Sequence, residues 1–448
     1  MLIVISDIHL EECTLGVHPA LRVNRNLDAK AYQKFIRGIA KEAAVNHARS
    51  VDLVLAGDIL ELNHSNIWYE NGVKPYINAK EITPGSEHEK KILRLLDLIG
   101  EEEKVAASLA VIRDFSTYFS TDFHLHYLLG NHDRLVNATP ATRAKARALL
   151  GLPGSDAPLP HTFTYMDHDK PLAFVRHGHE YDPMNFSANY RTASLIPANI
   201  PLQEYEAAPV DDFSAIELVY KLPYLFASHY GTQTILQNEN LQHLYFRLVE
   251  FQDVRPQSAL INFLLTMPGF TRRQVWQYLE PIILKAVNDL RKDPYLNSPA
   301  MQGNILRKIV RLNPWHKNIP YRLVHRASNS ITNRIGKNEQ DLPAGREELL
   351  QKNGDSVRCV ISGHTHQPQV ALLDAQDGVE RYYFNSGTWR NQVPVSPNQA
   401  SFGRIKTFSN VVVYGADENH SHTETRSTWS FDFSAGFSQK FYNGMRRV

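Results

Sequence analysis

Residues 51–58 read VDLVLAGD, a mostly apolar run that ends at a glycine and an aspartate. A similar run, LIVISD, occupies residues 2–7 and also ends at an aspartate. Between the two, residues 28–48 carry apolar side chains at helical spacing along one face. A strand, a helix and a second strand in this order predict a β-α-β unit, because parallel strands need such a crossover. The sequence therefore predicts an α/β (or α+β) fold.

Further runs extend this pattern on both sides of a long central segment. Helical spacing continues over 87–119, and another helix is expected from about residue 343 to residue 354. Turn residues at 168–171 and 376–378 predict two β-hairpins. The remaining expected strands are 123–129, 161–167, 172–177, 357–361, 369–374, 380–385, 410–416 and 427–433.

The central segment from residue 183 to residue 344 differs from the rest of the chain. Strand patterns nearly stop there, and apolar residues between 241 and 251 keep helical spacing. A capping box at Thr271 marks the start of a further helix. Because a structureless loop of this length is uncommon in a compact domain, we expect a large, mostly helical insertion or cap at 183–344. Residues 1–182 and 345–448 would then form one discontinuous domain.

The composition is that of a globular protein with balanced charge. The 448 residues include 48 Lys and Arg against 47 Asp and Glu, which argues against a stable nucleic acid partner. Only two cysteines are present, which excludes a disulfide framework and favours a reducing compartment. The N-terminus lacks the features of a signal peptide, and no apolar stretch is long enough for a transmembrane segment. We therefore expect a cytoplasmic protein.

Polar residues directly follow five of the expected strands, and glycine flanks most of them. The five segments are Asp7-Ile8-His9, Gly57-Asp58, Gly130-Asn131-His132-Asp133, His177-Gly178-His179 and Gly363-His364-Thr365-His366. In open α/β sheets, binding sites assemble at the carboxyl ends of the strands. We therefore expect these carboxylates, imidazoles and the amide of Asn131 to meet at one edge.

These donor types indicate metal ions. Carboxylate, imidazole and amide donors without a thiolate suit divalent ions, with Mn²⁺ as the first expectation and Fe²⁺ or Zn²⁺ as alternatives. About seven donors exceed one tetrahedral site, so we expect two ions with one carboxylate bridging them. Asp7 and Asp58 would cancel only two of their four positive charges. The remaining charge would attract phosphate.

Together the five segments resemble the signature of the calcineurin-like metallophosphoesterases. The resemblance covers roughly residues 1–182 and 345–448 and implies a four-layer sandwich of two mixed β-sheets flanked by helices. It implies that the first metal is held by Asp7, His9 and His366, the second by Asn131, His177 and His364, and that Asp58 bridges. It also implies that His177 is a ligand rather than His179, which would support a ligand or face the substrate.

The resemblance implies a metal-dependent hydrolase of phosphate esters. Metal ions lower the pKa of water enough to supply hydroxide near neutral pH, and a hydroxide bridging both ions would attack phosphorus in line. His132 would stabilise or protonate the leaving oxygen, and Asp133 would orient its ring. In this family a segment similar to Asn385-Ser386-Gly387 often closes a turn beside the site, so Asn385 is a further candidate.

Several alternatives remain open at this point. The motif style also resembles the branch that includes UDP-2,3-diacylglucosamine pyrophosphatase, which implies a pyrophosphatase acting on a nucleotide or a nucleotide-linked lipid. A nuclease and a non-catalytic scaffold of the same fold are two further hypotheses. The expected partner is a phosphorylated small molecule, a nucleotide or a lipid. Basic residues between 307 and 326 would meet phosphates or a membrane surface, or form a solvated face.

Overall fold

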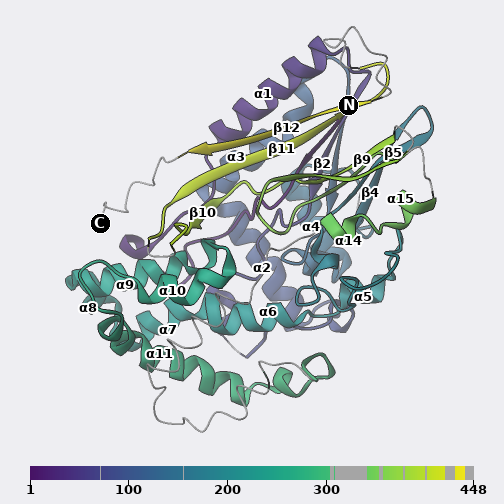
Figure 1. The fold of residues 1–448 in the computed structure, drawn as a ribbon. Helices are drawn as coiled ribbons and strands as arrows, with labels where there is room; N and C mark the ends of the chain where they lie inside the picture. The colour runs from purple at the N-terminus through teal and green to yellow at the C-terminus, as the bar shows by residue number, and fades with distance from the viewer. Residues whose placement is uncertain are drawn as a thin grey trace.

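The computed structural model of the protein has two mixed β-sheets that pack face to face, with helices on their outer faces (Figure 1). The residues that it describes are 1–70, 72–154, 156–302, 307, 341–352, 357–376, 379–398, 401–418 and 429–438. The predicted α/β class with two mixed sheets is confirmed.

The first sheet has seven strands in the order β3-β2-β1-β11-β10-β6, with β12 paired to β11. These strands are β1 (Leu2–Ile5), β2 (Ser50–Ala56), β3 (Asp122–Leu128), β6 (Val254–Arg255), β10 (Asn391–Pro394), β11 (Ile405–Tyr414) and β12 (Ser430–Ser438). β1, β2 and β3 are parallel, and helix α1 (Ala29–Val45) connects β1 to β2. The predicted β-α-β unit is therefore confirmed.

The second sheet has five strands in the order β4-β5-β7-β9-β8. They are β4 (Thr162–Asp167), β5 (Lys170–Arg176), β7 (Cys359–Ser362), β8 (Gln369–Gln376) and β9 (Val379–Asn385). β5, β7 and β9 are parallel, and the two edge strands are antiparallel to their neighbours. The β4–β5 turn is shorter than predicted, because His168 and Asp169 alone make it, both with positive φ. Residues 377–378 of the other predicted turn lie outside the described residues.

The side chains of β1 point alternately to the two faces of the first sheet, and each face packs against a different layer. Leu2 and Val4 pack between the two sheets, whereas Ile3 and Ile5 pack against the helices on the outer face. Those helices are α1, α2 (Glu87–Glu101), α3 (Glu103–Arg113) and α4 (Pro140–Leu150). On the outer face of the second sheet, Leu350 joins the same apolar cluster as strand residues of β7 and β9. The result is the expected order of helix, sheet, sheet and helix.

The prediction of a single helix from residue 343 to residue 354 is wrong. The structure has two short helices there, α14 (Asp341–Ala344) and α15 (Glu348–Lys352). Between them, the carbonyl of Arg346 accepts from the backbone N–H of Ile196 at 2.8 Å, and the N–H of Glu348 donates to the Ile196 carbonyl at 2.9 Å. These groups pair with the insertion instead of continuing one helical ladder.

The described part of the insertion is mostly helical, as expected. Its helices are α5 (Leu202–Glu206), α6 (Val210–Ala215), α7 (Lys221–Tyr230), α8 (Thr232–Gln237), α9 (Glu239–Glu250), α10 (Leu260–Leu265) and α11 (Arg272–Lys292). The capping box of Thr271 and Gln274 is present at the start of α11. Leu225, Leu244 and Val275 belong to an apolar core that these helices share. Strand β6 was not expected, because two residues are too few to show alternation.

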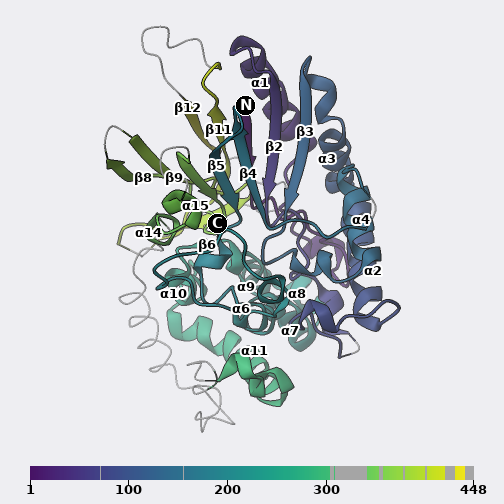
Figure 2. The ribbon, with the colours of Figure 1, turned by 90° about the vertical axis from the view of Figure 1, so that its right-hand side faces the viewer.

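The insertion lies at the end of the sandwich toward which β2 and β3 point (Figure 2). Short 3₁₀ turns are η1 (Pro19–Leu21), η2 (Asn66–Tyr69), η3 (Ala79–Glu81), η4 (Phe115–Tyr118), η5 (Arg134–Asn137), η6 (His179–Tyr181), η8 (Phe251–Asp253), η9 (Gln257–Ala259), η10 (Pro294–Asn297) and η11 (Pro299–Met301). η7 (Ile216–Tyr220) is a π-helical segment that joins α6 to α7. Within the described residues, no helix is long and apolar enough to cross a membrane. The predicted basic stretch, apart from Arg307, lies outside the described residues.

Candidate metal centre

The strand ends bring the expected donors together. Asp7 and His9 follow β1, Asp58 follows β2, Asn131 follows β3, His177 follows β5, and His364 and His366 follow β7. Because neighbouring parallel strands end at the same edge, these donors come close to one another although they span most of the chain. All but His364 are buried, and His364 is partly buried.

The backbone at these strand ends adopts an uncommon conformation. Positive φ angles occur at five of the candidate ligands: Asp7 (52°), His9 (49°), Asp58 (54°), His364 (70°) and His366 (60°). Left-handed backbone at a residue other than glycine costs roughly 1–3 kcal/mol and persists where surrounding structure enforces it. Such conformations concentrate at functional sites, and five of the eight non-glycine residues with positive φ among the described residues lie at this edge, which supports a site there.

The glycines beside the ligands are required by close packing. A Cβ at Gly57 would collide with the ring of His177, and one at Gly130 with the carboxylate of Asp58. A Cβ at Gly363 would collide with the carboxylate of Asp7. Each glycine therefore gives a ligand from another strand the space to reach the edge.

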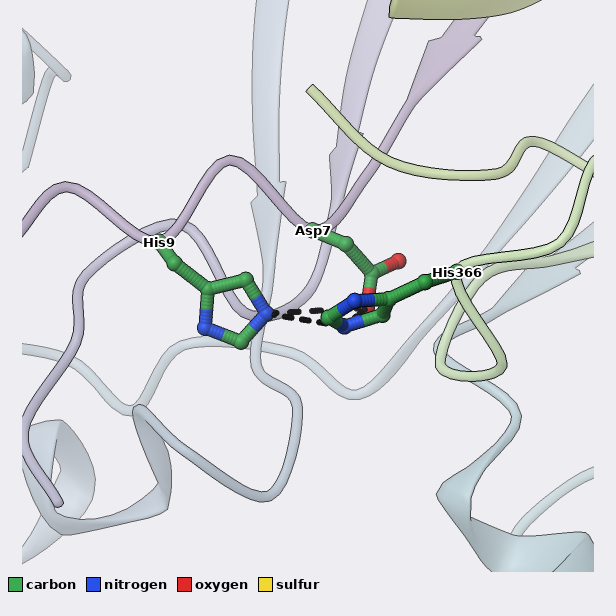
Figure 3. Close-up of side chains that lie close together, drawn as sticks. All are labelled: Asp7, His9 and His366. Atoms are coloured by element: carbon green, nitrogen blue, oxygen red, sulfur yellow. Dashed lines mark hydrogen bonds and ion pairs between the residues drawn. The ribbon is translucent and has the colours of Figure 1, made fainter. Parts of the chain in front are cut away.

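The first cluster consists of Asp7, His9 and His366 (Figure 3). Nε2 of His9 lies 3.1 Å from Nε2 of His366, which lies 3.3 Å from Oδ1 of Asp7. Burial raises the pKa of the Asp7 carboxyl, but His177 and His366 outweigh burial and lower this pKa to about 2. The cluster thus presents an ionised carboxylate and two imidazole nitrogens around one point.

The second cluster consists of Asp58, His177 and His364. Nδ1 of His177 donates to the carbonyl of Ala56 at 2.8 Å, which turns Nε2 toward Oδ2 of Asp58 at 3.1 Å. Within the described residues Nε2 of His177 has no hydrogen-bond partner despite its burial, because this contact lacks hydrogen-bond geometry. Burial lowers the pKa of His177, but Asp58 and Asp7 outweigh burial and raise it to about 10. The carboxylates therefore favour a positive charge, either a proton or a cation, at this nitrogen.

Asp58 lies between the two clusters. Its Oδ2 is 3.1 Å from Nε2 of His177 in the second cluster and 3.8 Å from Nε2 of His9 in the first. Its other oxygen, Oδ1, accepts from the backbone N–H of His132 at 2.8 Å. Burial raises the pKa of Asp58, but His177 and His132 outweigh burial and hold it well below its ordinary value. This position is the one expected of a bridging carboxylate.

Asn131 and His364 are oriented by the first residues after η6. Nδ2 of Asn131 donates to Oδ1 of Asn185 at 3.2 Å, which leaves Oδ1 of Asn131 buried and without a partner among the described residues. Nδ2 of Asn185 donates to Oδ2 of Asp182 at 3.0 Å, and Nε2 of His364 contacts the same oxygen at 3.3 Å. This contact leaves Nδ1 of His364 as the donor atom for a cation. Sequence reasoning missed Asp182 and Asn185.

His179 and Asn385 lie behind the ligands. The ring of His179 is 5.3 Å from that of His177, and burial lowers the pKa of His179 to about 3. His179 belongs to none of the donor clusters among the described residues. Nδ2 of Asn385 donates to the carbonyl of Gly363 at 2.6 Å, and its Oδ1 accepts from the Gly387 N–H at 3.0 Å. Asn385 therefore shapes the turn that carries His364.

The expectation that Asp133 orients His132 is wrong. The carboxylate of Asp133 accepts from the backbone N–H groups of Ile59 (2.9 Å) and Gly130 (2.6 Å), and from the hydroxyl of Tyr127 (2.6 Å). Nδ1 of His132 instead contacts Glu61 at 2.9 Å. Both oxygens of Asp133 thus accept hydrogen bonds from other groups, and the partner of the His132 ring is Glu61.

Glu61 is the functional candidate that sequence reasoning missed. Its carboxylate accepts from Nδ1 of His9 at 2.8 Å as well as from His132, so it holds one ligand and one candidate acid. Burial lowers the pKa of His132, but Glu61 and Asp58 outweigh burial and raise it to about 10. The available signal was a carboxylate three positions after Asp58, between two apolar residues.

The residues present fit divalent cations. Among the described residues, three groups of carboxylate and imidazole donors have their donor atoms within 4.8 Å of one another: Asp7, His9 and His366; Asp58, His177 and His364; and His9, Glu61 and His132. Each could hold a metal ion, and the third group shares His9 with the first. The orphaned Oδ1 of Asn131 and Nε2 of His177 are the donors that a cation would satisfy. No protein-family model matches the sequence, and no curated protein matches it either.

Proposed function

We propose that the protein is a two-metal-dependent hydrolase of phosphate esters. The observation that carries this proposal is the place of Asp58, whose Oδ2 faces both His9 and His177 from between two donor clusters. A single structural metal would need only one such cluster. A shared carboxylate between two clusters suits a pair of ions that act on one phosphoryl group.

Each side chain has a defined part in this proposal. Asp7, His9 and His366 would hold one ion, Asn131, His177 and His364 the other, and Asp58 both. Mn²⁺ is the first choice for such oxygen and nitrogen donors, with Fe²⁺ or Zn²⁺ as alternatives. A pair of such ions supplies Lewis acidity toward phosphoryl oxygens and lowers the pKa of water toward neutrality.

His132 is placed to serve the leaving group. Its ring lies 4.7 Å from the ring of His9, edge to face, so it borders the first cluster. Its Nδ1 is held by Glu61 at 2.9 Å, which leaves Nε2 as the nitrogen that donates a proton. An imidazole held by a carboxylate in this way is a suitable general acid for an alkoxide leaving group.

The substrate class is a phosphorylated small molecule, nucleotide or lipid. The donors are buried at the edge where the helical insertion lies, which favours a substrate of limited size over a nucleic acid duplex. The balance of 48 basic and 47 acidic residues also supports this choice.

The test replaces Asp58 with asparagine and counts metal ions. Chelated and Mn²⁺-reloaded protein should bind two ions and hydrolyse a generic ester such as p-nitrophenyl phosphate, its bis ester or a nucleoside diphosphate. Asp58→Asn should lose at least one ion and nearly all hydrolysis. Asp52→Asn is the matched control, because Asp52 lies on β2, the strand that leads to Asp58, and contacts His126 at 2.8 Å, away from the donors.

Two results would contradict the proposal. One is a wild-type protein that binds no metal at micromolar concentration and cleaves none of the three substrates. The other is an Asp58→Asn variant that keeps both ions and normal turnover.

A further inference from the structure

Arg255 reaches the first donor cluster from the helical insertion. It belongs to β6, which pairs in parallel with β10 of the first sheet, so its backbone is fixed to the sandwich. One guanidinium nitrogen donates to the carbonyls of Gln252 and Val254 at 2.8 and 2.9 Å. The other terminal nitrogen donates to Nδ1 of His366 at 2.9 Å. The insertion thus places a cationic side chain in contact with a candidate ligand.

Arg255 forms no direct ion pair among the described residues, although Asp253 and Asp7 attract its charge from farther away. Within the described residues no carboxylate oxygen lies within 4.0 Å of its guanidinium, whereas nearby Arg25 pairs with Glu11 at 2.7 Å and Arg390 with the same carboxylate at 2.9 Å. Burial lowers the pKa of Arg255, because a desolvated guanidinium is disfavoured. A guanidinium in such surroundings attracts an anion from outside the protein.

The contact with His366 conflicts with metal binding at the same ring. Arginine only donates hydrogen bonds, so Nδ1 of His366 must accept from Arg255. A cation held by Nε2, the nitrogen that faces Asp7, uses the lone pair there, and the neutral imidazole then carries its proton on Nδ1. Two donors cannot bond to each other. Metal binding at the first cluster would therefore release one terminal nitrogen of Arg255 beside the ion.

We propose that Arg255 is a substrate-binding residue that pairs with the free oxygens of a phosphate monoester or terminal phosphate. This inference rests on the proposed function and extends it to the substrate class. A guanidinium is planar and matches two phosphoryl oxygens at once. Its positive charge adds to that of the metal ions, so the binding of a dianionic monoester is strengthened more than the binding of a monoanionic diester. The insertion thereby takes part in substrate selection without supplying a metal ligand.

The test compares Arg255→Gln with wild-type protein in the full chain. Mn²⁺ binding is measured first by calorimetry, and then binding of inorganic phosphate to the Mn²⁺-loaded protein. Arg255→Gln should bind two Mn²⁺ ions at least as tightly as wild type, because a competitor for His366 is removed. Its affinity for phosphate should fall by about 10- to 100-fold, as expected for lost charge-assisted hydrogen bonds. The phosphate affinity of Arg255→Lys should lie between those of wild type and Arg255→Gln, because lysine keeps the positive charge but lacks the planar guanidinium that binds two oxygens.

Kinetics supply the substrate preference. The loss of kcat/KM in Arg255→Gln should be several-fold larger for p-nitrophenyl phosphate than for the bis ester. Arg404→Gln is the matched control, because Arg404 also joins the sandwich to the insertion and pairs with Glu250 away from the ligands. This control should change neither Mn²⁺ nor phosphate binding.

The outcomes separate this inference from the proposed function. If wild type binds Mn²⁺ and phosphate and Arg255→Gln binds phosphate equally well, the role of Arg255 is refuted while the hydrolase proposal stands. If Arg255→Gln loses Mn²⁺ together with phosphate, Arg255 is a structural support of His366 and the inference is also refuted. A wild type that binds neither Mn²⁺ nor phosphate refutes both proposals.

Discussion

Replacing Glu61 with glutamine should weaken the hydrogen bonds that hold the imidazoles of His9 and His132. One oxygen of Glu61 accepts from the backbone N–H groups of Asn63 and His64 at 2.9 and 3.0 Å, and the other from Nδ1 of His9 at 2.8 Å. Glutamine has one oxygen only. If that oxygen, Oε1, keeps the two backbone donors, the amide NH₂ takes the place of the oxygen that accepts from His9. His9 then has no acceptor, whereas His132 keeps its 3.0 Å contact with Oε1 and loses only the 2.9 Å contact with the other oxygen.

The expected magnitudes follow from these lost contacts. His9 would lose the bond that leaves its Nε2 free for a cation, and loss of such a supporting bond weakens metal affinity by about 10- to 100-fold. His132 would keep a neutral amide oxygen in place of a carboxylate, so turnover of an ester with a poor leaving group should lose part of the about 10²- to 10⁴-fold that acid catalysis contributes. Because both effects originate from one carboxylate, the losses should not simply multiply.

The assay is Mn²⁺ titration followed by hydrolysis of an alkyl phosphate at saturating Mn²⁺. Glu12→Gln is the matched control, because buried Glu12 also accepts two backbone N–H groups and the hydroxyl of Ser65 but no histidine. Glu12→Gln should retain metal affinity and turnover. Equal losses in both variants would refute a specific role of Glu61, because Glu12 lies in the segment after β1 and Glu61 in the segment after β2. Unchanged metal affinity and turnover in Glu61→Gln would refute the role of Glu61.

Three further predictions concern individual residues. His177→Ala should lose one Mn²⁺ ion, whereas His179→Ala should keep both ions, because only His177 lies in a donor cluster. Counting the bound metal ions in each variant checks this prediction. Loss of an ion in His179→Ala alone would make His179 the ligand. His132→Ala should keep both ions but slow hydrolysis of an alkyl ester by about 10²- to 10⁴-fold. Hydrolysis of p-nitrophenyl phosphate should slow much less, because its leaving group needs no proton. Equal losses of rate for the two esters would exclude an acid role for His132. Gly130→Ala should destabilise the fold by about 1–3 kcal/mol in denaturant unfolding, because its Cβ would lie 2.8 Å from both the backbone nitrogen of Asp58 and Cδ2 of His177. Gly38→Ala, at an exposed position of α1 with no atom within 4 Å of the new Cβ, should instead stabilise by about 0.5–1 kcal/mol.

Periodicity along the chain was enough to predict most of the secondary structure. The β-α-β unit of β1, α1 and β2 is visible because buried strands are continuous apolar runs and the helix repeats its apolar face. Where the prediction was wrong, contacts with distant residues decided the outcome. Ile196 takes the backbone groups that would have joined α14 to α15, and β6 exists because β10 offers a partner.

The candidate ligands could also be predicted from local sequence, because each directly follows a strand. Parallel strands end at one edge, so position after a strand already implies proximity. The glycines at 57, 130 and 363 accompany the ligands because a Cβ there would occupy the space of a ligand from another strand. The pairing of His366 with Asp7 and of His177 with Asp58 agrees with the two groups expected.

What surrounds those ligands was decided by the tertiary structure alone. The local sequence does not show that Glu61, rather than the adjacent Asp133, is the partner of His132. In the fold, Asp133 accepts from the N–H groups of Gly130 and Ile59, whereas Glu61 lies 2.9 Å from Nδ1 of His132. Arg255 is 111 residues from His366 in the chain, and their contact arises only when the insertion packs on the sheet. The sequence by itself determined most of the elements and the donor types, because those depend on local periodicity and chemistry. The fold decided the partners, because hydrogen bonds depend on distances between segments that are remote in sequence.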